Sequence, residues 1–173
     1  MLRDQGFETM DSKVLDDLTV ADFNTDTVRA YRNRFRTVRQ GSSWTDLDDE
    51  RFLRAIGAAA VSREDGRLHP TFGGLLMFGN DYDIVRECPH YFLDYQETLD
   101  PAIRWTDRVH SGDGMWSGNL FDFFFRVNRK LAESLKTPFK LDGIFRVDDT
   151  PIHKALREAL ANCLFNADYR GVR

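Results

Sequence analysis

The segment from 117 to 135 carries a helical pattern of large apolar side chains, and this pattern limits the fold more than any other feature of the chain. Its apolar positions are Leu120, Phe121, Phe124, Phe125, Val127, Leu131 and Leu135. They recur at the spacing of one wide helix face. The chain has 14 phenylalanines among 173 residues, and so many rings avoid water only by packing against one another. The sequence therefore predicts a folded protein in which other elements pack on a long phenylalanine-rich helix.

Charge and composition argue against several classes of protein. The formal net charge is -4, whereas a protein whose main task is to grip phosphate backbones is usually basic, because it binds by releasing counterions. No apolar stretch approaches the roughly 20 residues that cross a bilayer, and the first residues contain no apolar signal core. The isolated Cys88 and Cys163 indicate neither a zinc site nor a disulfide. We expect a cytoplasmic protein with no membrane partner.

Local signals place the secondary structure. Asn24 suits the N-cap of a helix, Gly57 suits a left-handed C-cap, an Asp-Gly turn at 65–66 suits a hairpin, and Pro151 suits the first turn of the last helix. The expected elements are an extended arm over 1–22, a helix over 25–39, a helix from 45 or 46 to 56, strands over 58–61 and 67–69, a helix capped by Thr71, strands over 91–97, 102–110 and 140–147, and helices over 117–135 and from 151 to 165 or 168.

These elements predict an α+β fold. A helical N-terminal lobe is expected first, followed by a small mixed sheet packed on the phenylalanine-rich helix and the terminal helix. Residues 1–45 are interpreted as an arm and a basic amphipathic helix, which link to a preceding domain. Residues 46–173 are interpreted as an α+β middle domain that ends in the first helix of a further domain. The chain is thus expected to be an internal piece of a longer protein.

The first helix carries a stripe of arginines beside its apolar face. Its members are Arg29, Arg32, Arg36 and Arg39. Such a stripe can contact a nucleic-acid backbone or an acidic partner surface. It can also be the solvated side of an ordinary amphipathic helix, and acidic residues close by, such as Asp22 and Asp26, dilute its field. Both interpretations stay open on the sequence.

The glycine-rich stretch, the histidines and the serines of the chain do not indicate a functional site. Gly74 and Gly79 are followed by Asn80 and Asp81, where a phosphate loop needs Lys and a hydroxyl, and large apolar residues fill the interval between the glycines. The four histidines have neither metal-ligand nor triad spacing, and no serine occupies a nucleophile elbow.

The last helix carries Glu158 and Asn162 four residues apart, and therefore on one face. A carboxylate and a carboxamide so aligned can polarise a water molecule and offer an oxygen to Mg²⁺. The simpler alternative is that both are polar residues on the solvent-exposed side of an Ala/Leu-rich helix.

At this helix the sequence resembles a known family. Residues 157–169 resemble the "REALxNAxxHxDY" signature of bacterial proteins described as RecG-related helicases or transcriptional regulators, with Asn166 in place of the histidine. Residues 71–79 resemble the "AGLLLFG" segment of that family, and residues 118–121 resemble the start of its "GNL" helix. The three landmarks keep their order across the second half of the chain.

The resemblance implies a layout and a function. A Schlafen/AlbA-like DNA-binding domain is expected first, then this middle region, then a domain like the ATP-binding fold of gyrases and histidine kinases. On that basis Glu158 is the expected general base, Asn162 the expected Mg²⁺ ligand, and Asp168 a nucleotide contact, all only in the complete protein. The chain itself is expected to bind no cofactor and to show no activity, whereas ATP and Mg²⁺ belong to the full-length protein.

Three functions follow from the sequence. The first is a connector and scaffold between DNA-binding and ATP-binding parts of a transcriptional regulator, with DNA as the partner of the other domain and with self-association as a possible property. The second is part of a DNA-dependent, helicase-like ATPase. The third is a protein-interaction domain that binds neither nucleotide nor DNA.

Overall fold

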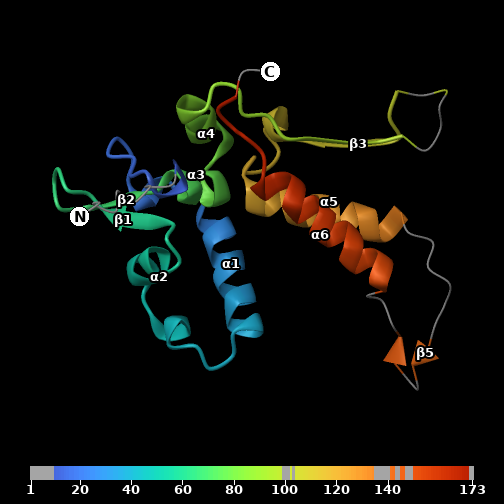
Figure 1. The fold of residues 1–173 in the computed structure, drawn as a ribbon, viewed down its shortest axis with the longest axis horizontal. Coiled ribbons are helices and arrows are strands. Elements are labelled where there is room, and N and C mark those ends of the chain that lie inside the picture. Colours follow the sequence, from blue (N-terminus) through green and yellow to red (C-terminus); the bar gives the residue numbers. More distant parts are fainter. Residues whose placement is uncertain are drawn as a thin grey trace, which may run out of the picture.

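The computed structural model describes residues 10–98, 102, 104–134, 141–142, 145–146 and 150–171. Within them the chain has the predicted α+β fold (Figure 1). Its helices are α1 (Thr25–Val38), α2 (Asp49–Ala55), α3 (Phe72–Phe78), α4 (Asp81–Glu87), α5 (Leu120–Ser134) and α6 (Pro151–Phe165). Its strands are β1 (Ala59–Val61), β2 (Leu68–Pro70), β3 (Asp94–Glu97), β4 (Asp107–His110), β5 (Leu141–Asp142) and β6 (Phe145–Arg146). Short 3-10 helices lie at Met10–Ser12, Val20–Asp22, Ser43–Asp46 and Ser111–Asp113.

The predicted caps begin and end these helices. The side chain of Asn24 accepts a hydrogen bond from the backbone N–H of Thr27 at the start of α1. The Thr71 hydroxyl accepts one from Gly74 at the start of α3, and Asn119 accepts one from the backbone N–H of Asp122 at the start of α5. Each bond satisfies a backbone donor that has no partner inside its helix. Gly57, after α2, is left-handed at φ 77° as expected.

Helix α3 lies in the middle of the molecule. Figure 1 shows α5 and α6 side by side on one half, and α1, α2 and the β1–β2 pair on the other. A Cβ on Gly74 would stand 1.9 Å from the carbonyl oxygen of Ala58, so only glycine lets α3 approach the chain this closely where it enters β1. The arm joins the same region, where the backbone N–H of Leu15 donates to the Pro70 carbonyl.

Two apolar clusters form the core, and α3 belongs to both. The larger contains Leu75 and Leu76 of α3, together with Val127 of α5 and Leu164 of α6. The smaller contains Phe78 of α3, together with residues of α1, α2 and β1 such as Leu53 and Ala59. Tyr31 of α1 connects the two halves, because its ring lies 5.1 Å from that of Phe78 and 5.6 Å from that of Phe121.

Several predicted details are wrong. The second helix begins after Asp48 rather than at Thr45 or Asp46, since Leu47 is extended and the Asp48 carboxylate caps α2. Helix α4 was not predicted. Among the described residues the strands form three separate antiparallel pairs, β1–β2, β3–β4 and β5–β6, rather than one mixed sheet. Residues 10–22, expected to be extended, contain two 3-10 turns. The division of the chain at 45/46, which lies at the 3-10 helix Ser43–Asp46, stays a prediction.

Candidate functional site

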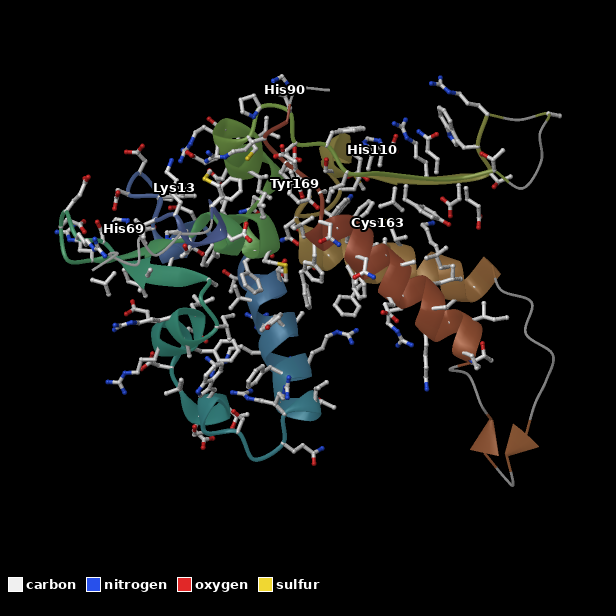
Figure 2. All side chains as sticks on the ribbon, viewed as in Figure 1. Lys13, His69, His90, His110, Cys163 and Tyr169 are labelled. Atoms are coloured by element: carbon white, nitrogen blue, oxygen red, sulfur yellow. The ribbon has the colours of Figure 1, made fainter. Side chains whose placement is uncertain are left out.

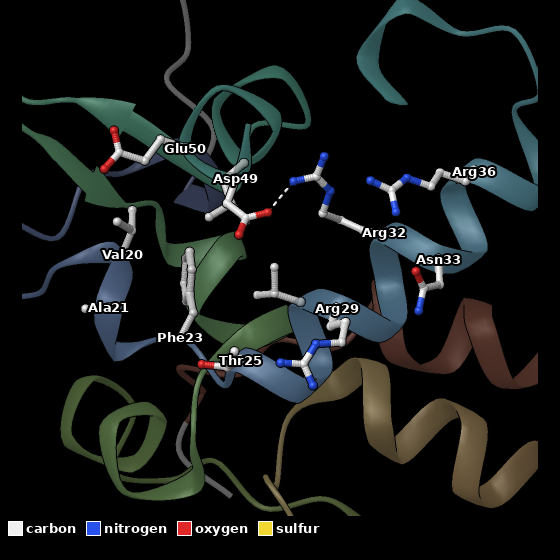
Figure 3. A pocket seen from close by; sticks show the side chains of 12 residues that line it. Val20, Ala21, Phe23, Thr25, Arg29, Arg32, Asn33, Arg36, Asp49 and Glu50 are labelled. Carbon is white, nitrogen blue, oxygen red and sulfur yellow. Dashed lines mark hydrogen bonds and ion pairs between the residues drawn. The ribbon is translucent and has the colours of Figure 1, made fainter. Parts of the chain in front are cut away.

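A pocket of about 370 Å³ lies between α1 and α2, and three of the predicted arginines line it. Figure 3 shows Arg29, Arg32 and Arg36 following one another along α1, with Asp49 and Glu50 of α2 across from them. The apolar part of the lining is Val20, Ala21, Phe23, Val28 and Leu53. The pocket therefore combines an apolar patch with charges of both signs.

Arg32 is the fixed member of the stripe. Its guanidinium donates to the Asp49 carboxylate and to the Leu47 carbonyl oxygen, and it lies 4.8 Å from the centre of the Phe52 ring. Only 12% of its side chain is exposed. Because its charge is paired and its stem is packed, Arg32 serves the junction between α1 and α2 as well as the pocket.

Arg29 and Arg36 are exposed. Arg29 pairs with Asp26 at 3.0 Å, and the side chains of both are largely in solvent, where such a pair contributes little to stability. Arg36 has no hydrogen-bond or ion-pair partner anywhere in the part of the chain that the structure describes. These two guanidiniums are the ones that a ligand can reach without breaking the fold.

The rest of the stripe does not join the pocket. Arg39 follows α1 as its exposed C-cap residue and is absent from the lining of this pocket. Arg34 extends to another side of α1 and lies 3.7 Å from the centre of the Phe125 ring. The structure thus places three members of the stripe at the pocket and leaves Arg39 outside it, while Arg34 lies apart from the stripe.

Glu158 and Asn162 occupy an outer side of α6. Both are exposed, and neither side chain has a hydrogen-bond partner among the described residues. The opposite side of α6 packs on α5, with Leu164 buried in the larger cluster. The two residues share one helix face, as predicted, but the face is open rather than enclosed.

Asp168 lies beyond the end of α6, in a turn that the structure holds against the body of the protein. Its carboxylate accepts a hydrogen bond from the backbone N–H of Arg170. The neighbouring Tyr169 donates its hydroxyl to the Leu164 carbonyl at 2.6 Å, and its ring lies 5.6 Å from that of Tyr91. Burial raises the pKa of the Tyr169 hydroxyl to about 12, so it remains a donor at neutral pH. Asp168 is therefore placed by packing of the turn and not by α6 itself.

The candidate nucleotide residues fit only part of a nucleotide site. They offer one carboxylate and one carboxamide on a helix, plus a separate carboxylate on a turn. The described residues contain no group of three or more His, Cys, Asp or Glu side chains placed to hold a metal ion. Figure 2 also shows His90 and Cys163 well apart, although both line one pocket.

Sequence reasoning missed the acidic side of the arginine pocket. The carboxylate that pairs with Arg32 belongs to Asp49, in the first turn of α2, and Asp49 is not among the site residues that the sequence indicates. An acidic run at one helix start and a basic stripe on another helix are a signal for such a pair, but the sequence does not show that the two helices touch.

The fold and the pocket define a small α+β protein with an arginine-lined recess between two helices. Among the described residues no helix is long and apolar enough to cross a membrane. Residues 1–94 match the family described as a domain of unknown function, DUF8451. Since the match covers more than half of the 173 residues, the chain belongs to this family. Comparison with curated proteins and with solved structures gives no match.

Proposed function

We propose that this chain is the connector and scaffold of a DNA-binding transcriptional regulator of the RecG-related kind, between a DNA-binding part and an ATP-binding-type part. The observation that carries the proposal is the state of α6. One side of α6 is fixed to α5, while Glu158 and Asn162 stand exposed on another side. A helix held in this way can present one wall of a nucleotide site to a further domain.

The described residues offer only this part of such a site. A nucleotide site needs a base pocket, a phosphate lid and Mg²⁺ ligands that are held together. Within the described residues, Glu158 and Asn162 have no partners that would complete one. ATP and Mg²⁺ would therefore bind in the full-length protein, with Asn162 holding the ion and Glu158 acting as the base, and this chain by itself would release no phosphate.

DNA binding belongs to the other part of the regulator in this proposal. The net charge of -4 opposes attraction to phosphate backbones, and two of the pocket arginines already pair with carboxylates. The chain alone is therefore expected to bind DNA weakly or not at all. A cytoplasmic location and self-association through α6 are part of the same proposal.

The test is a titration with fluorescent ATP and Mg²⁺. It compares this chain with a longer protein that carries the expected ATP-binding part, each with and without Asn162→Ala. Binding by the longer protein only, lost on substitution, supports the proposal. Asn33→Ala, an exposed change on α1, is the matched control and should leave binding unchanged. Failure of the longer protein to bind would refute the role of α6.

The competing function is a helicase-like ATPase. It requires phosphate release that depends on Glu158. Release of phosphate by this chain that disappears in Glu158→Ala would replace the connector by an enzyme.

A further inference from the structure

The pocket between α1 and α2 has a chemistry that the connector role does not use. Its apolar part is made by residues from three segments, with Phe23 and Leu53 buried beneath it. At about 370 Å³ it can hold one large side chain with some of its neighbours. An apolar side chain of a ligand would lose water there and gain packing partners.

The α1 wall of the pocket carries an excess of positive charge. Arg32 and Arg36 are four residues apart on α1, so their like charges lie on one face of the helix and repel each other. The Asp49 carboxylate neutralises Arg32, but no described residue pairs with Arg36. Figure 3 shows the guanidiniums of both residues extending from α1 toward the pocket. An incoming carboxylate could accept charge-assisted hydrogen bonds from the unpaired guanidinium of Arg36.

The surroundings favour a protein ligand over a nucleic acid. A sugar-phosphate backbone has no large apolar group that could fill the apolar part of the pocket. A peptide with spaced carboxylates and one apolar residue matches both parts of the pocket.

We propose that this pocket binds a short acidic protein segment that carries one large apolar side chain. The apolar side chain enters between Val28 and Leu53, and the flanking carboxylates accept hydrogen bonds from Arg29 and Arg36. Arg32 stays with Asp49 and holds the wall in shape. The proposal does not depend on α6 or on any nucleotide site.

The test uses a fluorescein-labelled peptide of sequence Glu-Asp-Glu-Leu-Asp-Glu and measures its anisotropy on titration with the full chain. Arg36→Glu and Arg29→Glu should each weaken binding about tenfold, because each loses a charge-assisted contact and adds a repulsion. Arg54→Glu makes the same change of charge at an exposed position of α2 outside the pocket lining, and it should change affinity less than about twofold. A peptide with serine in place of leucine should bind several-fold more weakly.

Each of these measurements has an outcome that would overturn the proposal. Equal affinity of the wild-type protein and the two pocket variants would place the peptide elsewhere, and absence of binding would reject the site. Equal affinity for the leucine and serine peptides would remove the role of the apolar patch. A labelled single-stranded DNA that binds more tightly than the peptide, with the same loss in Arg36→Glu, would make the pocket a nucleic-acid site. None of these readouts involves Glu158 or Asn162, so they leave the connector proposal independently testable.

Discussion

The side-chain amide of Asn119 donates a hydrogen bond to the Gly79 carbonyl at 3.0 Å, and the two residues are 40 positions apart in the sequence. The same amide group donates to the Thr27 hydroxyl oxygen at 3.2 Å, while the amide oxygen caps α5 through the N–H of Asp122. Asn119 is fully buried. One side chain thus fixes the starts of α1 and α5 to the end of α3.

Replacing Asn119 should therefore cost far more than an ordinary polar substitution. Asn119→Ala leaves the Gly79 carbonyl buried without this donor and removes the cap of α5, so we expect a loss of about 2–4 kcal/mol in the free energy of unfolding. Urea denaturation followed by circular dichroism measures it. Asn33→Ala, on the exposed side of α1, should change the same quantity by less than about 0.5 kcal/mol. Comparable losses in the two variants would show that the buried network is not important.

The neighbouring glycines of α3 allow a second, paired comparison. Gly74→Ala would place its Cβ 1.9 Å from the Ala58 carbonyl oxygen, so backbone must move and we expect a loss of about 3 kcal/mol or failure to fold. At Gly73 the nearest atoms are 3.2 Å away, in Asp11 near the edge of the fold. Gly73→Ala should thus be tolerated, with helix propensity offsetting the crowding. Thermal unfolding compares the melting temperatures of the two variants. Equal stability of Gly74→Ala and Gly73→Ala would contradict the close packing of α3 against the backbone at Ala58.

Both ring nitrogens of His69 face oxygen atoms, an arrangement that favours the protonated form of the ring. Its Nδ1 lies 2.6 Å from the Leu18 carbonyl oxygen and its Nε2 lies 3.0 Å from the Asp65 carboxylate. Neither oxygen can donate a hydrogen, so both ring nitrogens must do so. The bond to Leu18, then that to Asp65, with a further contribution from the charge of Asp16, raises the pKa of His69. Hydrogen bonds from the Arg67 backbone and from His69 lower the pKa of Asp65.

The pair predicts a pH dependence with a definite sign. The His69 contribution to stability is complete below its unfolded pKa of about 6.5 and is lost as pH rises through the higher folded value. The Asp65 contribution is present above about pH 4 and is lost as pH falls. The melting temperature should thus fall as the pH rises above about 6.5, and His69→Gln should flatten that slope. An unchanged slope in His69→Gln would show that other groups cause it.

Exposed apolar residues on α6 predict self-association. Ile152 near the start of α6 is 58% exposed and Phe165 at its end is 71% exposed, and large apolar side chains left exposed are candidates for contact with other proteins. If the connector proposal holds, the chain should form concentration-dependent oligomers, and Ile152→Glu with Phe165→Glu should make it monomeric. Light scattering coupled to size-exclusion chromatography measures the mass. A wild-type chain that stays monomeric at high concentration would contradict the expectation.

Local rules predicted the helix starts at Asn24, Thr71 and Pro151, because a cap depends on a few adjacent residues. They failed where two candidates compete, since Asp46 and Asp48 can both cap a helix and only Asp48 does. Helix α4 was missed because Ile84 is its only buried residue and leaves almost no apolar period. At the candidate site the arginine positions were predictable, whereas the pairing of Arg32 with Asp49 depends on how α1 and α2 pack.

The end of the family match lies inside the structure rather than at its edge. Residue 94 is the first of β3, and its partner in β4 is His110. The larger apolar cluster combines residues before this point with Val127 and Leu164. A chain of residues 1–94 should therefore lack cooperative unfolding in calorimetry, whereas residues 1–173 should give a single transition. A sharp transition from 1–94 would refute this.

Helix α3, which both apolar clusters share, is the reason why residues 1–94 are not expected to unfold cooperatively. Its residues complete two clusters at once, so neither half retains a closed interior when the other is removed. The stretch of sequence that matches the family model is therefore expected to need the second half of the chain in order to fold.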